Sequence, residues 1–349
     1  MTRVLQIVEA SDADLAEWDA FIQASPAATF FHRFGWRNVI KRTYGYSSCY
    51  LMAKRGGRIE GVLPLIDVTS PIFGRNLIST AFTVGGGIVA GDAAARSALA
   101  EAAVEEGRKR RVKYVELRSR TADLEGWAVK DSVYAGFERL IPQDADENLK
   151  EIPRKRRAEV RKAITSLEAG EVKYHYTKDV EPFYGLYAFA MREHGTPVFP
   201  RRFASEQLRE FGEDAEILVI TAGGEAVLSL LTFNFRDYVL PYYFAAGPRA
   251  REFRAFDLAI WLQMRRGAER GARIFDFGRA KFGAGSFDYK MHWGFEPAAL
   301  GYQYALIGAR ETPNINPNNP KFARVSEAWK RLPLPVANLA GPLLARHLA

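Results

Sequence analysis

The feature that most constrains the fold of this chain is an internal duplication with a spacing of 160 residues. The segment KYVEL begins at Lys113 and follows a helix-like stretch that contains Gly107. The segment RIFDF begins at Arg273 and follows a similar stretch that contains Gly267. A repeat of this length indicates two copies of one structural unit.

A second matched pair lies upstream of these segments. CYLMAKRGGRIEGVLPLIDV, from Cys49, mirrors EILVITAGGEAVLSLLTFNF, from Glu216. Both contain two apolar runs joined by a Gly-Gly turn, which is typical of a β-hairpin. Each half therefore reads as a hairpin, a further strand, an amphipathic helix and a strand, and we expect two α/β units.

The length and the local composition suggest how these units divide the chain. A chain of 349 residues favours two domains. The break near Gln143 to Leu149 places the first domain at 1–145 and the second at 146–309, with a C-terminal extension at 310–349.

The composition predicts a cytoplasmic protein with substantial cores. Hydrophobic residues make up 48% of the chain, yet no run approaches the roughly 18 residues that span a bilayer, and the N-terminus lacks the apolar region of a signal peptide. The one cysteine, Cys49, excludes an internal disulfide and is predicted to be buried in a strand. None of the five histidines has metal-ligand spacing, so we expect no metal.

The formal net charge of +8 favours an anionic partner. The candidates are tRNA, a nucleotide-linked substrate and the face of an anionic membrane. Many basic enzymes bind no polyanion, and the charge alone does not choose between these alternatives.

The segment from Arg273 to Pro297, RIFDFGRAKFGAGSFDYKMHWGFEP, is the strongest candidate for a functional site. It begins as a strand, breaks at Gly278, passes through the small-residue loop GAGS, and resumes with aromatic residues around Lys290. Glycines beside lysine and arginine suit an anionic ligand or a developing oxyanion that approaches the backbone closely. The alternative is a core strand followed by a surface hairpin with solvated charges.

Two further basic segments are candidates for anion binding. IPRKRRAEVRK, from Ile152, has Pro153 at a position suited to the first turn of a helix, and it is either a solvated helix or one that contacts phosphates. A predicted helix over 34–43 places Arg37 and Lys41 on one side, four residues apart.

The order strand, strand, strand, loop, helix, strand in the second half is that of an acyl-CoA N-acyltransferase-like (GNAT-like) unit. In that fold, backbone N–H groups of the loop before the central helix bind a pyrophosphate. Here the loop is GPRAREFRAF, which contains Arg249 and Arg254 but no run of glycines. This loop therefore does not support coenzyme A binding.

The C-terminal tail contains two candidate helices after an Asn/Pro connector from Thr312 to Pro320. A short helix is predicted from Phe322 to Leu332. The stretch from Leu334 to Leu348 is apolar with basic ends, and it either docks on the body of the protein, pairs with a partner, or lies on a membrane surface.

Together these residues resemble the FemAB-related family, whose members contain tandem GNAT-like domains. The resemblance rests on IPRKRRAEVRKA, HGTPVFPRRF, the Arg273–Pro297 block and NPKFARVSEAWKRLPLPVANLAGPLLARHL. The C-terminal match resembles the subgroup associated with exosortase/PEP-CTERM exopolysaccharide systems. The implied fold has two GNAT-like domains with mixed, largely antiparallel sheets and a C-terminal helical tail.

The resemblance implies acyl transfer, most naturally aminoacyl transfer, to an amine acceptor in cell-envelope or exopolysaccharide biosynthesis. No resident cofactor is implied. The donor is an aminoacyl-tRNA, an acyl-CoA or an acyl carrier protein, and the acceptor is a nucleotide- or lipid-linked precursor. The implied location is the cytoplasm, with peripheral contact at the inner face of the plasma membrane through the tail.

The resemblance also assigns roles to individual residues. Lys290 matches the family lysine before the Trp-Gly pair, which stabilises the oxyanion, while Tyr289 and Tyr302 are predicted as strand aromatics within reach of it. Asp276 and Asp288 are the candidates that take a proton from the attacking amine, and Asp288 is better explained as a surface charge. The candidates for substrate contacts are Arg37, Lys41, Arg279, Tyr243, Ser286, Tyr302 and Trp293, and those for donor contacts are Arg249, Arg254, Arg156, Arg157 and Arg161.

A second hypothesis is a binding or scaffold protein of an exopolysaccharide system that keeps the fold without the chemistry. It rests on the missing glycines of GPRAREFRAF. Turnover with any acyl donor would exclude it.

Overall fold

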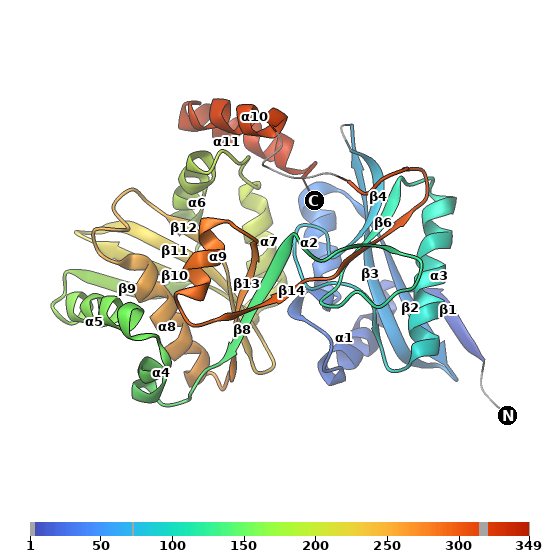
Figure 1. Ribbon diagram of the computed structural model, residues 1–349, viewed down its shortest axis with the longest axis horizontal. Coiled ribbons are helices and arrows are strands. Elements are labelled where there is room, and N and C mark those ends of the chain that lie inside the picture. The colour runs from blue at the N-terminus through green and yellow to red at the C-terminus, as the bar shows by residue number, and fades with distance from the viewer. Residues whose placement is uncertain (1–3, 72, 314–319, 349) are drawn as a thin grey trace. The chain divides into compact units, whose positions relative to one another are not determined.

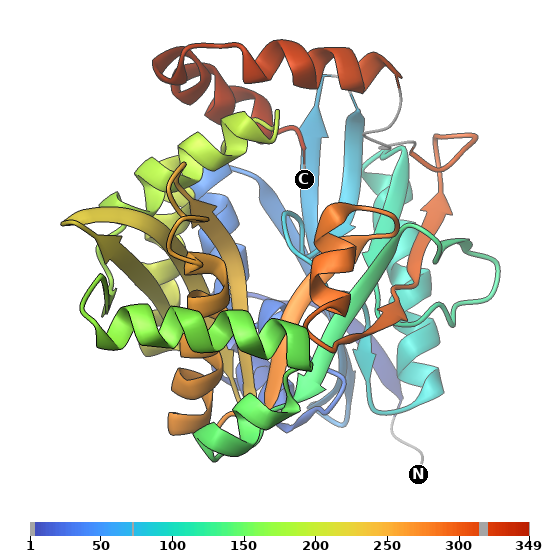
Figure 2. The same cartoon turned by 60° about the vertical axis from the view of Figure 1, so that its left-hand side comes forward.

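The computed structural model describes residues 4–71, 73–313 and 320–348 (Figures 1 and 2). It divides into two compact units. Unit 1 comprises Met1–Tyr134, Ala299–Ile315 and Arg346–Ala349, and unit 2 comprises Ala135–Ala298 and Asn316–Ala345. The predicted Asn/Pro connector falls mainly on residues 314–319, which lie outside the described residues.

Unit 1 is built on a mixed sheet with the strand order β1-β2-β3-β4-β6-β15-β7, and β5 pairs with β3. The strands are β1 (Leu5–Glu9), β2 (Ser47–Arg55), β3 (Arg58–Ser70), β4 (Gly74–Ser79), β5 (Val89–Ala90), β6 (Tyr114–Arg118), β7 (Ala128–Lys130) and β15 (Tyr302–Leu306). The α-helices are α1 (Leu15–Ala24), α2 (Gly35–Tyr44) and α3 (Ala93–Lys109). One core of this unit lies between α3 and the sheet and contains Cys49, which is buried as predicted.

Unit 2 has a second mixed sheet, with the order β14-β8-β13-β12-β11-β10-β9. Its strands are β8 (Tyr134–Leu140), β9 (Val172–Thr177), β10 (Ala215–Ala222), β11 (Glu225–Phe235), β12 (Tyr238–Ala246), β13 (Ile274–Lys281) and β14 (Glu296–Ala299). Its helices are α4 (Ala145–Glu151), α5 (Arg154–Glu168), α6 (Glu181–Glu193), α7 (Arg201–Phe211), α8 (Ala255–Glu269), α9 (Gly285–Met291), α10 (Pro320–Lys330) and α11 (Leu334–Ala345). Both α6 and α8 contact β10, β11 and β12, so they cover opposite faces of the sheet.

The duplicated pattern is confirmed as a repeated unit. The order β2-β3-β4-α3-β6 in unit 1 recurs as β10-β11-β12-α8-β13 in unit 2. In both sheets the hairpins are antiparallel, and the strand after the central helix returns parallel to the strand before it. The prediction of two mixed, largely antiparallel GNAT-like sheets with a C-terminal helical tail is therefore correct.

Two strands join a sheet that is distant from them in sequence. β15 follows all the strands of unit 2 along the chain but pairs with β6 and β7 of unit 1. β8 precedes the second repeat, and all but its first residue belong to unit 2, where it lies between β13 and β14. Neither unit is therefore one continuous segment of the chain.

No helix within the described residues is long and apolar enough to cross a membrane.

The glycines that mark the duplication allow each central helix to approach its sheet closely. A Cβ on Gly267 of α8 would lie 2.6 Å from Cγ1 of Val239 in β12. A Cβ on Gly107 of α3 would overlap Ile307 and come within 3.0 Å of Val115 in β6. The glycines thus serve the same packing purpose in the two units.

The space around each helical glycine predicts opposite effects for two glycine-to-alanine substitutions. Gly267→Ala should lower the free energy of unfolding by about 1–3 kcal/mol, because the methyl group has no space. Gly185→Ala in α6 meets nothing within 4 Å and should raise that free energy by roughly 0.5–1 kcal/mol. Urea denaturation of both variants tests this, and a stable Gly267→Ala protein would show that α8 does not need the close approach.

Candidate active site

The central feature of unit 2 is the divergence of β12 from β13. The two strands pair in parallel through Tyr238 with Ile274 and Val239 with Phe275, and their described register ends there. The register of β12 against β11 shifts between Leu231 and Thr232, which adds one residue to β12 and bends it. Beyond the paired residues, β12 and β13 therefore separate, and their facing backbone edges are no longer paired with each other. An extended ligand with amide groups can form hydrogen bonds in such an opening.

Unit 1 contains the same divergence, but its own side chains close it. β4 and β6 pair in parallel through Leu77 with Val115 and Ile78 with Glu116. The next residues are bridged, because Arg118 N–H donates to Ser79 Oγ at 2.8 Å and Arg118 Nη1 donates to the Thr83 carbonyl at 3.0 Å.

The repeat places Gly278 of unit 2 at the position of Arg118 in unit 1. Arg118 is buried and pairs with Glu116 at 2.8 Å, and the repeat equates Glu116 with Asp276. Gly278 has a φ of 66°, a left-handed conformation that suits glycine, and its N–H donates to Asp276 Oδ1 at 2.7 Å. The long side chain that fills the opening in unit 1 is therefore absent from this position in unit 2.

Lys290 is a buried cation held against β13. Its Nζ donates to the carbonyls of Phe277 at 2.5 Å and Arg279 at 2.9 Å, on either side of Gly278. It lies 5.3 Å from the ring centre of Phe137 in β8 and 5.0 Å from that of Phe277. The side chain connects α9 to the kinked strand, and two of its three N–H groups are used in doing so.

The pKa of Lys290 is lowered to about 8, chiefly by burial; the Asp276 carboxylate opposes this shift and the Arg279 guanidinium adds to it. The amine therefore changes charge close to neutral pH. A lysine in this state can stabilise negative charge when protonated and accept a proton when neutral.

Tyr289 lies on a helix, so its prediction as a strand residue is wrong. The GAGS loop leads into α9, and the Tyr289 hydroxyl donates to Asp257 Oδ1 at 3.2 Å. Arg156 Nη1 donates to the same oxygen at 2.9 Å, and the Arg156 guanidinium lies 4.9 Å from the centre of the Tyr289 ring. Two of the predicted residues, Tyr289 and Arg156, thus meet at Asp257, a residue that was not predicted from the sequence.

Asp257 lies in the first turn of α8 and is largely buried. Desolvation raises its pKa, and the Arg156 guanidinium opposes that shift. Desolvation by burial also raises the pKa of Tyr289, so its phenol stays protonated. One signal in the sequence indicated the position of Asp257: an acid three residues after Arg254 is typical of the first turn of a helix.

The other predicted donor-binding arginines lie on α5 and before α8. Arg254 donates to Glu159 at 2.8 Å, Arg249 donates to Glu252 at 3.1 Å, and Arg157 Nη1 donates to the Lys150 carbonyl at 3.0 Å. Arg161 is exposed. Two ion pairs, Arg254 with Glu159 and Arg156 with Asp257, therefore link α5 to the start of α8, the helix end at which the GNAT fold binds pyrophosphate.

Tyr243 contributes to a narrow aromatic pocket between α6, α7 and β12. Its other lining residues are Phe183, Tyr184, Tyr187, Phe199, Pro200, Phe203, Ala204 and Gln207. Gln207 is fully buried, and neither atom of its amide has a hydrogen-bond partner among the described residues. Such an amide favours a small ligand group that both donates and accepts hydrogen bonds.

The remaining predicted residues lie in both units. In unit 2, Ser286 is exposed on α9, Trp293 is fully buried just after α9, and Arg279, whose carbonyl accepts from Lys290, lies half-buried on β13. The residues predicted in the first half belong to unit 1, as does Tyr302, which is buried on β15.

Arg37 and Lys41 both lie on α2, as predicted, but in different surroundings. Arg37 pairs with Asp12 at 2.6 Å and donates to Ser48 Oγ at 2.8 Å. Lys41 is exposed.

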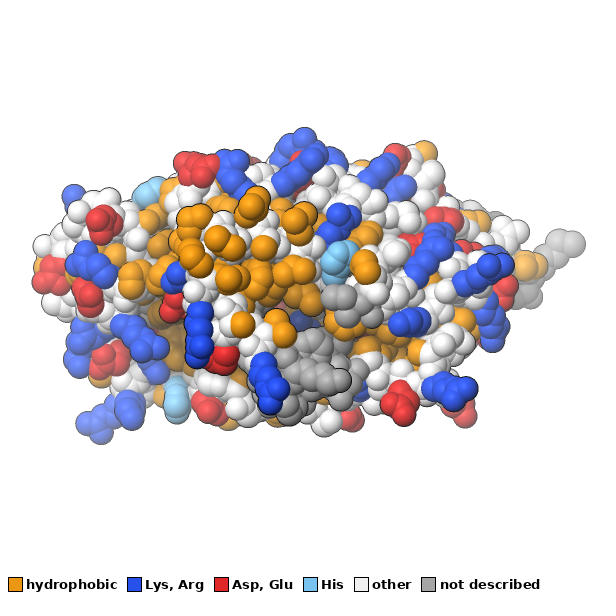
Figure 3. Space-filling view, turned by 90° about the horizontal axis from the view of Figure 1, so that it is seen from above, with side chains coloured by type: hydrophobic (Ala, Val, Ile, Leu, Met, Phe, Trp, Pro, Cys, Tyr) orange, Lys and Arg blue, Asp and Glu red, His pale blue; other side chains and the backbone are white. Residues whose placement is uncertain are grey.

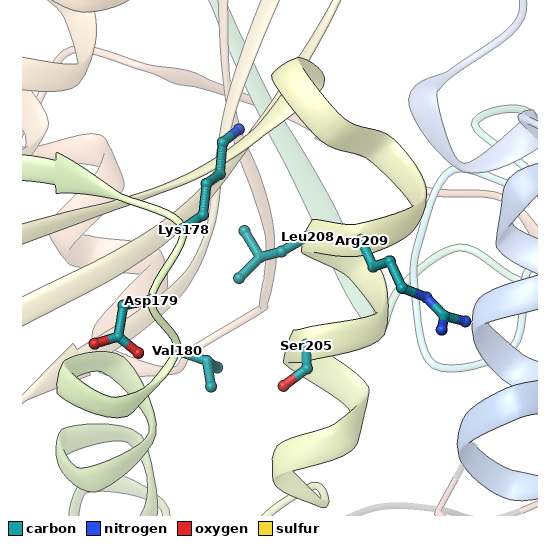
Figure 4. Close-up of a pocket in the computed structure, with 6 residues that line it drawn as sticks. All are labelled: Lys178, Asp179, Val180, Ser205, Leu208 and Arg209. Atoms are coloured by element: carbon teal, nitrogen blue, oxygen red, sulfur yellow. The ribbon is translucent and has the colours of Figure 1, made fainter.

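A hollow of about 370 Å³ lies between the end of β9 and α7 (Figure 4). It is lined by Lys178, Asp179, Val180, Ser205, Leu208 and Arg209. Its two cations have other partners: Lys178 Nζ donates to the carbonyls of Gly212 and Ala215, and Arg209 pairs with Glu206 at 2.6 Å. The hollow therefore lacks converging polar groups, and we exclude it from the candidate site.

The lowered pKa of Lys290 predicts a specific pH dependence of stability. Unfolding restores the ordinary pKa of 10.5, so the unfolded chain binds more protons between pH 8 and 10.5. The contribution of Lys290 to the free energy of unfolding should therefore rise with pH through this window, by on the order of 3 kcal/mol. Lys290→Met has no group that titrates there. Urea denaturation of both proteins from pH 7 to 10.5 should show the wild type gaining stability relative to the variant, and a constant difference would contradict the burial of a titrating amine.

Comparison with known proteins identifies one domain. Residues 154–291 match the model of an acetyltransferase (GNAT) domain. This segment contains α5 to α9, with Lys290 near its end. No curated protein matches the sequence.

Solved structures resemble most of the chain in fold. FemX superposes with a TM-score of 0.70 over 87% of this chain and 98% of its own, at 14% identity. A tandem GNAT protein from the clavulanic acid biosynthesis pathway gives 0.55 over 88% and 100%, also at 14% identity. The C-terminal domain of a putative lysylphosphatidylglycerol synthetase from Agrobacterium fabrum gives 0.54 over 90% and 94%, at 12% identity. Residues 154–291 of unit 2 are therefore similar to a GNAT acetyltransferase domain, and the chain has a fold of two GNAT-like domains in tandem.

Proposed function

We propose that the protein is an acyltransferase whose chemistry takes place in unit 2. The observation that carries this proposal is the opening between β12 and β13 at Gly278, because Arg118 closes the equivalent opening in unit 1. In the proposed reaction an amine attacks the carbonyl carbon of an activated ester or thioester. The C–N bond forms, the bond to the leaving oxygen or sulfur breaks, and the amine loses a proton.

The side chains around Gly278 supply the groups that this reaction requires. Protonated Lys290 stabilises the oxyanion with its third N–H group, which is not used by the two carbonyls. Asp276 accepts the proton of the amine and passes one to the leaving oxygen or sulfur, and Tyr289, whose one proton is donated to Asp257, holds that carboxylate in place. Tyr243 and Gln207 contact a polar group of a substrate in the aromatic pocket.

We further propose an aminoacyl-tRNA as the donor. The ion pairs at the start of α8 disfavour a coenzyme A pyrophosphate there, because the nearby Arg254 and Arg156 already pair with Glu159 and Asp257. The exposed cations of α5 suit a polyanion instead. The resemblance of the sequence to the FemAB-related family also favours this donor.

For the acceptor we propose an amine on a nucleotide- or lipid-linked precursor of the cell envelope or of an exopolysaccharide, in the cytoplasm. The support is the C-terminal sequence resemblance to the exosortase/PEP-CTERM subgroup and the net charge of +8. On α2, exposed Lys41 is the better candidate for a phosphate contact than Arg37, which already pairs with Asp12.

One observation favours a second candidate function, a binding protein without catalysis. Lys290 is only 8% exposed and is held by two backbone carbonyls, as a purely structural lysine would be. Incubation with aminoacyl-tRNA, acyl-CoA and acyl carrier protein donors separates the two functions. Turnover with any donor excludes the binding protein, whereas thermal stabilisation by a donor without turnover favours it.

Lys290→Met should lower kcat/KM about 100-fold or more with the donor that turns over, because one oxyanion-stabilising group is lost. The matched control is Lys281→Met, in the same segment but outside the contacts of Lys290, and it should remain within about twofold of wild type. Circular dichroism checks that both variants are folded. A Lys290→Met protein with full activity would assign Lys290 to structure alone.

If the donor is tRNA, replacing the exposed cations Arg154, Lys155 and Arg161 with glutamine should weaken binding to all tRNA sequences. Each lost phosphate contact should also reduce the dependence of log affinity on log salt by roughly one. Arg156 is left unchanged because it pairs with Asp257.

The matched control for this experiment replaces Arg108, Lys109 and Arg202, which are similarly exposed but lie outside α5. Filter binding at several salt concentrations measures both slopes. Equal slopes of log affinity against log salt for the α5 variant and the wild type would show that α5 does not bind tRNA and would favour a small carrier-bound donor.

A further inference from the structure

The C-terminal helix α11 is almost entirely apolar. Its twelve residues, Leu334–Ala345, include one polar side chain, Asn338, and no charged one. A helix of this composition is normally buried. In this protein it is a surface helix that packs on α6 within unit 2.

Small residues form the face of α11 that packs on the body. Ala337, Gly341 and Ala345 recur every four residues and are buried. A Cβ on Gly341 would come within 2.8 Å of Val198 in the loop after α6. The small residues therefore fix which side of the helix faces inward.

The larger apolar residues of α11 lie on the opposite side and are exposed. Leu339 is 78% exposed, Leu343 64% and Val336 47%, and Val325 of α10 is 63% exposed. Figure 3 shows apolar side chains gathered over α10 and α11 on this face of the molecule. Exposed apolar residues that are grouped in this way indicate a surface that binds something apolar.

The composition of this surface favours a lipid bilayer over a protein partner. Among the side chains that the structure describes in α10 and α11, the strongly exposed apolar ones are aliphatic, whereas the centres of protein interfaces are enriched in aromatic residues and methionine. Exposed cations lie within α10, at Arg324, and at its junction with α11, at Lys330 and Arg331, and Glu327 of α10 is an acid that pairs with Lys330. Aliphatic residues on a helix with basic residues at its border are typical of proteins that lie on anionic membranes.

We propose that α10 and α11 form a docking surface for an anionic membrane. Leu339, Leu343 and Val336 insert at the level of the lipid headgroups, and Arg324 and Arg331 contact lipid phosphates. This inference does not depend on the proposed function, because it rests on contacts within α10, α11 and α6.

Co-sedimentation of the full chain with vesicles tests the proposal. The vesicles contain phosphatidylcholine alone, or phosphatidylcholine with about one-third phosphatidylglycerol. The wild type should bind the anionic vesicles and bind more weakly as salt is raised. Leu339→Glu/Leu343→Glu should lower the partition coefficient at least about tenfold. Arg324→Gln/Arg331→Gln should lower it roughly fivefold per charge on anionic vesicles and have little effect on neutral ones.

The matched control is Val4→Glu/Leu140→Glu, which places two charges at equally exposed apolar positions outside α10 and α11 and should bind like the wild type. The competing explanation is that a second copy of the chain binds this surface. Sedimentation velocity on the same proteins tests this by measuring their oligomeric state. A wild-type dimer that Leu339→Glu/Leu343→Glu dissociates, without vesicle binding, would overturn the proposal. So would a monomer that binds neither kind of vesicle.

Discussion

The parallel pairing between β12 and β13 is the constraint on which the rest of unit 2 depends. It joins the strands through Val239 and Phe275 and then ends, while α8 crosses the sheet closely because Gly267 has no side chain. The bend in β12 moves the two strands apart, and the kink at Gly278 turns β13 toward the loop that begins α9. Lys290 and Tyr289 owe their positions to that turn.

The same construction in unit 1 shows how one fold can serve two purposes. There the position of Gly278 is occupied by Arg118, and its buried ion pair with Glu116 and its bond to the Thr83 carbonyl connect the separated strands. A buried guanidinium that is paired with a carboxylate is expensive to displace. Unit 1 is therefore suited to be a rigid partner, and unit 2 is suited to admit a ligand.

The sequence was sufficient to predict the repeated unit, since apolar periodicity, Gly-Gly turns and the glycines of the central helices are local signals. It did not reveal that β8 and β15 each join a sheet distant in sequence, because pairing at a sheet edge depends on contacts that no local pattern records. For the site, it identified the segment around Gly278 and Lys290 but placed Tyr289 on a strand. It missed Asp257, whose importance comes from Arg156, about one hundred residues away along the chain.

The central claim is that the acyl donor binds where β12 and β13 separate. Hydrogen–deuterium exchange of the full chain, with and without each donor class, tests it most directly. Our account predicts that a donor slows exchange in residues 240–246 and 276–281 and leaves residues 79–83 and 116–118 of unit 1 unchanged. Protection of the unit 1 residues, with none in unit 2, would contradict it.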